Sequence, residues 1–166
     1  MKENILLILE FIVFVLVQVL LFNQIHIYGF GCIFLYILFV INYPFEHKNI
    51  YLVFWGFLLG FVIDMFSQSY GIHTFATTLI AYLRPSIIKL YAGSDDPEVL
   101  KKNYNYFGAT FYKYAVTIIL IHHFTLFMLE AFSLKFIFPV IFRTLISTLL
   151  TTVFVFFVQS ILVKRK

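Results

Sequence analysis

Six apolar runs, separated by polar or turn-forming breaks, occupy most of this chain. A helix needs about 20 apolar residues to cross a bilayer, and roughly 17 at the least, so each run is a candidate membrane span. We therefore predict an all-α integral membrane protein in which residues 1–166 form a single transmembrane domain of six transmembrane helices. The expected spans are residues 5–22, 28–41, 50–65, 72–90, 111–129 and 138–163.

The amino-acid composition excludes an ordinary soluble domain. Hydrophobic residues make up 62% of the 166 positions and charged residues only 12%, whereas a soluble domain is about half apolar and about a quarter charged. The 23 Phe and 11 Tyr residues suit a surface that faces lipid and its interfaces. No stretch of useful size remains for a separate soluble domain.

The second and third spans are short for a crossing helix. Residues 28–41 and 50–65 could instead form a re-entrant pair around Asn42, Tyr43 and Pro44. Such a pair would have to be buried in protein, because lipid offers no hydrogen-bond partners to backbone groups outside a helix. Either arrangement leaves both chain termini on one side of the membrane.

Basic residues predict the orientation, because they stay at the cytoplasmic ends of membrane helices. Six spans with both termini inside put ten of the twelve Lys and Arg residues on the inner side, and only Lys135 and Arg143 toward the outside. We therefore expect a multi-pass membrane protein with cytoplasmic termini and a cytoplasmic loop over residues 92–108. The net charge of +4 favours contact with anionic lipid headgroups over nucleic acid.

The third span carries Gly56, Gly60 and Asp64 at four-residue spacing, which places all three on or near one helix face. Glycines let a second helix approach closely, and a carboxylate in lipid must face protein or water. This pattern predicts a packing seam with a polar end. The seam either contacts a helix of a partner protein or shapes a pocket, or it packs internally against the fourth helix of the same chain.

Three charged residues are candidates for an ion pair inside the membrane. Asp64 and Glu130 should lie near the outer boundary, and Arg143 lies about one and a half turns into the sixth span from the same side. Because isolated charges in membrane spans are costly and functional by default, we predict that Arg143 pairs with Asp64 or Glu130.

Other polar residues give little support to catalysis or metal binding. His122 and His123 are adjacent, so they point about 100° apart on a helix and suit interhelical hydrogen bonds better than one shared ion. Cys32 is the single cysteine, and we expect it to be a small buried residue. Hydrolase, phosphate-loop and zinc motifs are absent, so we expect no enzyme, no catalytic residue, no metal and no cofactor.

Residues 55–84 resemble the signature of the rod shape-determining protein MreD family. In that family a G-x-x-x-G-x-x-x-D helix is followed by a polar outer turn, Gly-Leu-His or similar, and a small-residue-rich helix ending in Tyr-Leu. The run from Leu16 to Phe22 is also similar to the family's first helix, whereas the Pro44 loop is only a loose counterpart of its proline-bearing turn. The matching positions are Gly56, Gly60, Asp64, Gly71, His73, Ala76, Ala81, Tyr82 and Leu83.

The resemblance implies a non-enzymatic component of the bacterial cell-elongation machinery, located in the bacterial inner (cytoplasmic) membrane. Members of the family work with MreC, the actin-like MreB, RodA and a penicillin-binding transpeptidase in lateral peptidoglycan synthesis and maintenance of cell shape. Their fold resembles the six-helix S components of energy-coupling-factor transporters. It also implies a helix-packing or partner interface at Gly56, Gly60, Asp64, Gly71 and His73, and a homodimer is left open.

Two other functions compete with this expectation. A vitamin-binding S component has a similar size and topology, but its first helix commonly carries a small-residue docking motif, and residues 1–22 contain no alanine or glycine. A flippase or channel would need a continuous polar lining. The scattered Gln18, Thr117, His122, Ser147 and Thr151 do not clearly provide one.

Overall fold

The computed structural model describes residues 2–24, 31–44, 47–92 and 109–163. Within these ranges the regular structure is helical, without a strand. In chain order the elements are α1 (Lys2–Leu20), the 3-10 turn η1 (Phe22–Gln24), α2 (Ile37–Asn42), α3 (Asn49–Ser67), α4 (Ile72–Ala92), α6 (Ala109–Ala131), the 3-10 turn η2 (Leu134–Phe136) and α7 (Ile137–Val163).

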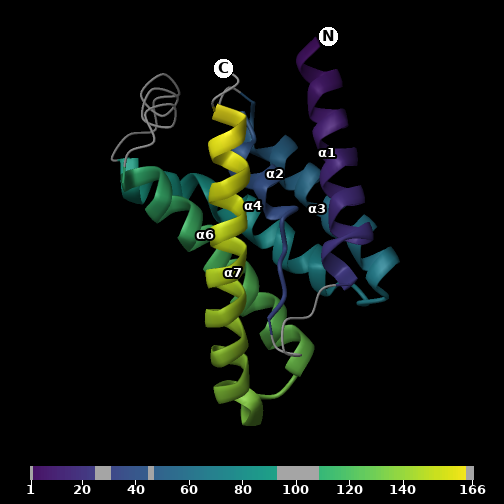
Figure 1. Cartoon of the computed structure of the whole chain (residues 1–166), viewed down its shortest axis with the longest axis vertical. Helices are drawn as coiled ribbons and strands as arrows, with labels where there is room; N and C mark the ends of the chain where they lie inside the picture. Colours follow the sequence, from purple (N-terminus) through teal and green to yellow (C-terminus); the bar gives the residue numbers. More distant parts are fainter. Residues whose placement is uncertain (1, 25–30, 45–46, 93–108, 164–166) are drawn as a thin grey trace.

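The chain passes back and forth along the long axis, so that α1 begins and α7 ends at the same end of the molecule (Figure 1). We call this the terminal end, and the opposite end, where η2 joins α6 to α7, the distal end. Four segments are long and apolar enough to cross a membrane, as expected for a helical membrane protein: Ile5–Gln24, Asn49–Ser67, Thr110–Ala131 and Leu134–Ile161. The helix α4 is long as well, but it is not among these four.

The second expected span is not a single helix. Residues 32–34 are irregular, and α2 that follows them has only six residues. This segment rises between α1 and α7 toward the terminal end (Figure 1), and the side chains from Cys32 to Ile41 are buried. Irregular backbone is tolerated at this depth because protein, not lipid, surrounds it. The prediction of a helical span over residues 28–41 was therefore wrong, and the structure favours the broken alternative for this run.

The third expected span is a full helix, because α3 extends from Asn49 to Ser67, a residue or two beyond the expected limits at each end. It packs along α4, its neighbour in the chain, from which the turn of residues 68–71 separates it. The loop expected over residues 92–108 lies outside the described residues, except for Ala92 at the end of α4.

Arg84 secures the C-terminal end of α2. Its side chain is buried, its Nε donates to the hydroxyl of Tyr114, and its Nη2 donates to the carbonyl of Tyr43. The Tyr114 hydroxyl in turn donates to the carbonyl of Ile41, 3.2 Å away. These donors satisfy carbonyls where α2 ends, so Arg84 closes a helix terminus within the protein.

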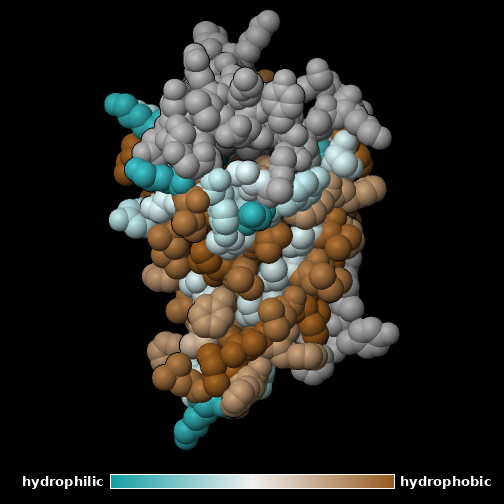
Figure 2. All heavy atoms as spheres, turned by 90° about the vertical axis from the view of Figure 1, so that its left-hand side faces the viewer, coloured by the Kyte–Doolittle hydropathy of each residue, from teal (hydrophilic) through white to brown (hydrophobic). Residues whose placement is uncertain are grey.

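The outer surface matches a molecule embedded in lipid. Figure 2 shows hydrophobic side chains over the middle of one face, with hydrophilic residues toward the two ends. Large apolar side chains are exposed on the outer faces of α1, α3 and α7, as with Leu9, Phe57 and Phe157. Lipid is as apolar as these side chains, so the exposure carries no solvation penalty there.

Candidate functional site

The two glycines of α3 form a seam that α4 fills. A Cβ atom added to Gly56 would lie 2.9 Å from the Cβ of Ala81. One added to Gly60 would lie 2.5 Å from the Cα of Thr74 and 2.6 Å from the carbonyl oxygen of His73. Because the obstructing atoms at Gly60 belong to backbone, only glycine fits this crossing. The seam is thus internal packing between α3 and α4, and the alternative of a partner helix at Gly56 and Gly60 is wrong.

Asp64 closes the distal end of this seam by capping α4. Its Oδ1 accepts from the backbone N–H of His73 at 3.0 Å and from the hydroxyl of Ser69, while its Oδ2 accepts from the N–H and hydroxyl of Thr74. The first N–H groups of a helix have no partner within it, and a carboxylate there also opposes the helix dipole. One side chain therefore fixes the start of the next helix.

The turn between α3 and α4 is held in a compact form that needs this cap. Gln68, Tyr70 and Gly71 all have positive φ, at 54°, 53° and 94°. Only glycine adopts this region without cost, so the two other residues store strain that the surrounding bonds must offset. Gly71 is exposed with open space around it, and its role is conformational rather than one of contact.

A buried chain of hydrogen bonds joins α4 to α6 through the irregular segment. The Tyr36 hydroxyl lies 2.8 Å from Nδ1 of His73 and 2.8 Å from Nε2 of His122. Phe34 packs against both rings, with centroids 5.2 Å from His73 and 5.8 Å from His122. The expectation that His122 makes interhelical hydrogen bonds agrees with this geometry.

The polar residues of α1 and α7 satisfy the irregular backbone. Gln18 accepts from the N–H of Leu35 and donates to the carbonyl of Ile33, at 2.9 and 3.0 Å. From α7, Ser147 accepts from the N–H of Cys32 and Thr151 from that of Phe34.

His123 joins the same network, with its Nε2 3.1 Å from the Thr151 hydroxyl. Gln18, His122, Ser147 and Thr151 are therefore all engaged in hydrogen bonds within the fold. Thr117, the fifth member of the expected polar set, pairs with the hydroxyl of Tyr91.

Arg143 pairs with Glu130, one of its two expected partners. Its Nη1 lies 3.1 Å from Oε1 of Glu130, and its guanidinium carbon lies 4.4 Å above the ring of Phe127. Asp64 instead accepts four hydrogen bonds from Ser69, His73 and Thr74, so it does not join this pair. The side chain of Arg143 is 26% exposed and that of Glu130 is 46% exposed, so the pair lies near the protein surface and not in the core.

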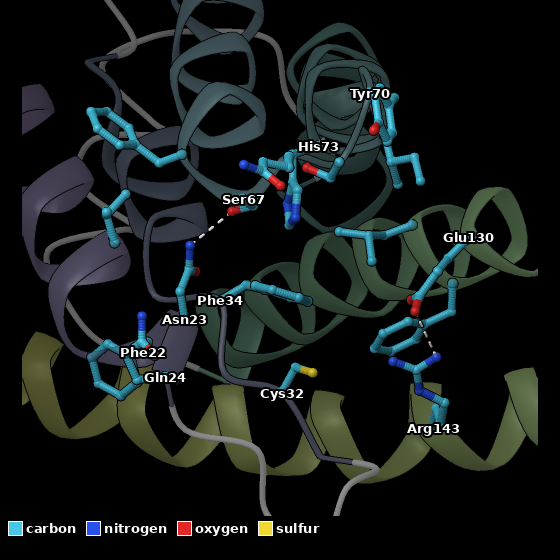
Figure 3. Close-up of a pocket in the computed structure, with 17 residues that line it drawn as sticks. Phe22, Asn23, Gln24, Cys32, Phe34, Ser67, Tyr70, His73, Glu130 and Arg143 are labelled. Carbon is cyan, nitrogen blue, oxygen red and sulfur yellow. Dashed lines mark hydrogen bonds and ion pairs between the residues drawn. The ribbon is translucent and has the colours of Figure 1, made fainter.

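These groups surround a pocket of about 580 Å³ at the distal end. Asn23, Ser67 and His73 lie on one side and the Glu130–Arg143 pair lies on the other, with Phe34 and Cys32 between them (Figure 3). Asn23 donates to Ser67 across 2.8 Å. The volume lies within the range of small-molecule sites, roughly 300–1,000 Å³.

Sequence reasoning singled out His73, Glu130 and Arg143 but missed Tyr36, Phe34 and Asn23. The two aromatic residues look like ordinary members of an apolar run, and only the loss of helix there brings them inward. Among the described residues, no group of three or more His, Cys, Asp or Glu side chains could hold a metal ion.

Fold and site together define a helical membrane protein with a polar pocket at its distal end. Comparison with protein-family models, with curated proteins and with solved structures gives no match for this chain.

Proposed function

We propose that this protein is a non-enzymatic membrane component of the bacterial cell-elongation complex, as its resemblance to the MreD family implies. In this role it binds MreC and supports lateral peptidoglycan synthesis beside MreB, RodA and a penicillin-binding transpeptidase. Its place is the inner membrane, with both termini cytoplasmic.

The observation that carries the proposal is that the signature residues all serve the packing of α3 against α4. Gly56 and Gly60 admit α4, Asp64 caps it, Gly71 permits the turn, and His73 joins the buried hydrogen-bond chain. Residues that define the resemblance thus build one rigid α3–α4 unit. A rigid scaffold suits a protein that positions partners instead of transforming a substrate.

Partner contact belongs on surfaces other than the glycine seam. Because α4 fills that seam, a membrane partner has to meet the outer faces of the helices. Phe57 and Phe61 are exposed on α3 and stack on each other with centroids 6.1 Å apart. Aromatic side chains of this kind are common anchors at interfaces.

Affinity purification from the native host tests the proposal. The tagged protein is extracted in a gentle detergent, and the co-purifying proteins are identified by mass spectrometry. Recovery of MreC, RodA or a transpeptidase, with rounding of cells when the protein is depleted, supports the elongation role. Recovery of a transmembrane coupling subunit with paired ATPases instead would overturn it.

The pocket favours a second candidate, the substrate-binding S component of a vitamin transporter of the energy-coupling-factor type. A cavity of about 580 Å³ with a few convergent polar groups has the form of a ligand site. Uptake of labelled vitamins by cells carrying the protein, and its loss on deletion, tests this candidate. Unchanged uptake across the vitamin panel would exclude it.

A further inference from the structure

The distal pocket contains hydrogen-bonding groups that the protein itself leaves unused. His73 is only 7% exposed and lines the pocket, yet its Nε2 has no partner among the described residues. The Nε of Arg143 is buried and also lacks one. A buried polar atom is nearly always paired in a folded protein, so the Nε of Arg143, with a second unpaired nitrogen beside the same cavity, points to an external partner.

The buried hydrogen-bond chain indicates which hydrogen His73 presents. A neutral imidazole has one N–H, and the Tyr36 hydroxyl has a single hydrogen to share between His73 and His122. Nδ1 of His122 is buried without a partner. An unpaired N–H is rarer in buried sites than an unpaired acceptor. We therefore assign the hydrogen of His122 to Nε2, from which it donates to Tyr36, and we assign the hydrogen of the Tyr36 hydroxyl to the bond with Nδ1 of His73.

This order leaves the hydrogen of His73 on Nε2, so His73 offers an N–H donor to the pocket. Arg143 adds the N–H groups that its ion pair with Glu130 does not use. The Ser67 hydroxyl already accepts from Asn23, and its own hydrogen is free to donate. The pocket therefore presents donors from both sides.

Phe22, Phe34, Phe66 and Phe127 supply apolar walls between these donors. Among the described residues that line the pocket, Glu130 is the one acidic side chain, and it is the more exposed partner of its pair. It can turn toward water while Arg143, stacked on Phe127, stays in place.

We infer that this pocket binds a molecule with an anionic carboxylate or phosphate group attached to an apolar body. The anion lies between Arg143, His73 and Ser67, and the body lies against the phenylalanine rings. A carboxylate or phosphate accepts two parallel hydrogen bonds from a guanidinium, which makes Arg143 the main contact. The inference goes beyond the proposed scaffold role and does not depend on it.

Cys32 provides a built-in reporter, because it lines the pocket and is the single cysteine of the chain. The full protein in nanodiscs of zwitterionic lipid is treated with two thiol reagents of similar size, an anionic sulfonatoethyl and a cationic trimethylammonioethyl methanethiosulfonate. Each rate of Cys32 modification, followed by intact mass, is divided by the rate of the same reagent with free 2-mercaptoethanol. We expect the anionic reagent to be favoured in this normalised comparison.

Three variants make the test specific. Arg143→Gln should lower the anion-to-cation ratio about tenfold, and Glu130→Gln should raise it, since each removes one charge at the pocket. Lys135→Gln removes an exposed cation at the same end that does not line the pocket, and it should leave the ratio unchanged. A ratio at or below one, an unchanged ratio in Arg143→Gln, or no reaction with either reagent would overturn the inference.

Two further arms distinguish the source of the anion. If the ligand is a soluble molecule, 4-phenylbutyrate or phenyl phosphate slows the reaction of Cys32, and the uncharged 4-phenylbutanamide does not. If it is a lipid headgroup, phosphatidylglycerol in the nanodisc slows the reaction without any added solute.

Discussion

The α3–α4 pair and the irregular segment at residues 32–36 bury backbone in the same protein by opposite means. In the pair, both segments are helical, so nearly every N–H and carbonyl is satisfied within its own helix. Asp64 supplies the missing partners at the N-terminus of α4. In the segment, the backbone bonds go to side chains of α1 and α7, as from Cys32 to Ser147.

The difference teaches where tolerance to mutation should lie. The pair depends on the absence of side chains at Gly56 and Gly60, so it is sensitive to added volume. The segment depends on the presence of particular polar atoms, so it is sensitive to their loss. One region is therefore limited by space and the other by hydrogen bonding.

Filling the seam should have the largest effect. Gly60→Ala places a Cβ against the backbone of Thr74 and His73, so α3 and α4 must separate. We expect a loss of about 3 kcal/mol of stability, at the upper end of overpacking costs. Thermal unfolding in detergent, followed by the emission of Trp55, measures it. Phe61→Leu on the exposed face of α3 is the control and should unfold as the wild type does. If Gly60→Ala is as stable as the wild type, the seam is not limited by the space between α3 and α4.

Removing the cap should come next. Asp64→Ala leaves two N–H groups of α4 and two hydroxyls without their acceptor, at a cost of about 2 kcal/mol. Asp64→Asn keeps one acceptor oxygen and should lose less. The same unfolding assay ranks the two variants, and the reverse order would show that the carboxylate does not act as a cap.

The hydrogen-bonded region is tested by a matched pair on α7. Thr151→Val removes the acceptor for the N–H of Phe34 and should cost about 1–2 kcal/mol. Thr148→Val removes a buried hydroxyl that has no partner, so its stability should be unchanged or higher. Hydrogen exchange of the peptide covering residues 32–36 should accelerate only in the first variant. Equal exchange in both would contradict the dependence of the segment on α7.

The smallest effect on stability is expected at the distal ion pair. Because Arg143 and Glu130 are both partly exposed, Arg143→Gln should change stability by no more than about 1 kcal/mol. Unfolding in detergent checks this value against wild type. A loss as large as that of Asp64→Ala would mean that Arg143 supports the fold beyond its contact with Glu130.

The sequence predicted the region limited by space better than the region limited by hydrogen bonding. Gly56, Gly60 and Asp64 follow helical spacing, so the seam and its polar end were visible, although the choice between a partner and α4 was not. The cap itself joins Asp64 to residues nine and ten positions later. That separation depends on the path of the turn, which no local pattern records.

The irregular segment had no comparable signal in its own residues. Residues 32–41 are almost entirely apolar, and such a run in a membrane protein predicts a helix. The available signal lay elsewhere, in the polar face that Thr144, Ser147 and Thr151 form on an otherwise apolar α7. A polar face of that kind indicates a neighbouring segment with unsatisfied backbone groups. The sequence of α7 does not tell which segment that is. For the same reason Tyr36 and the pocket beside it were not predicted.

The distant partners of Cys32 and Phe34 have a consequence for biosynthesis. These amides bond to residues 115 and 117 positions later in the chain, which the ribosome makes after all the other helices described here. Until α7 emerges, this stretch has no stable place in the hydrocarbon, so it must wait in water or within the insertion machinery. A nascent chain that stops before α7 should therefore be a substrate for membrane proteolysis, because the irregular segment then lacks the hydroxyl groups that accept from its amides.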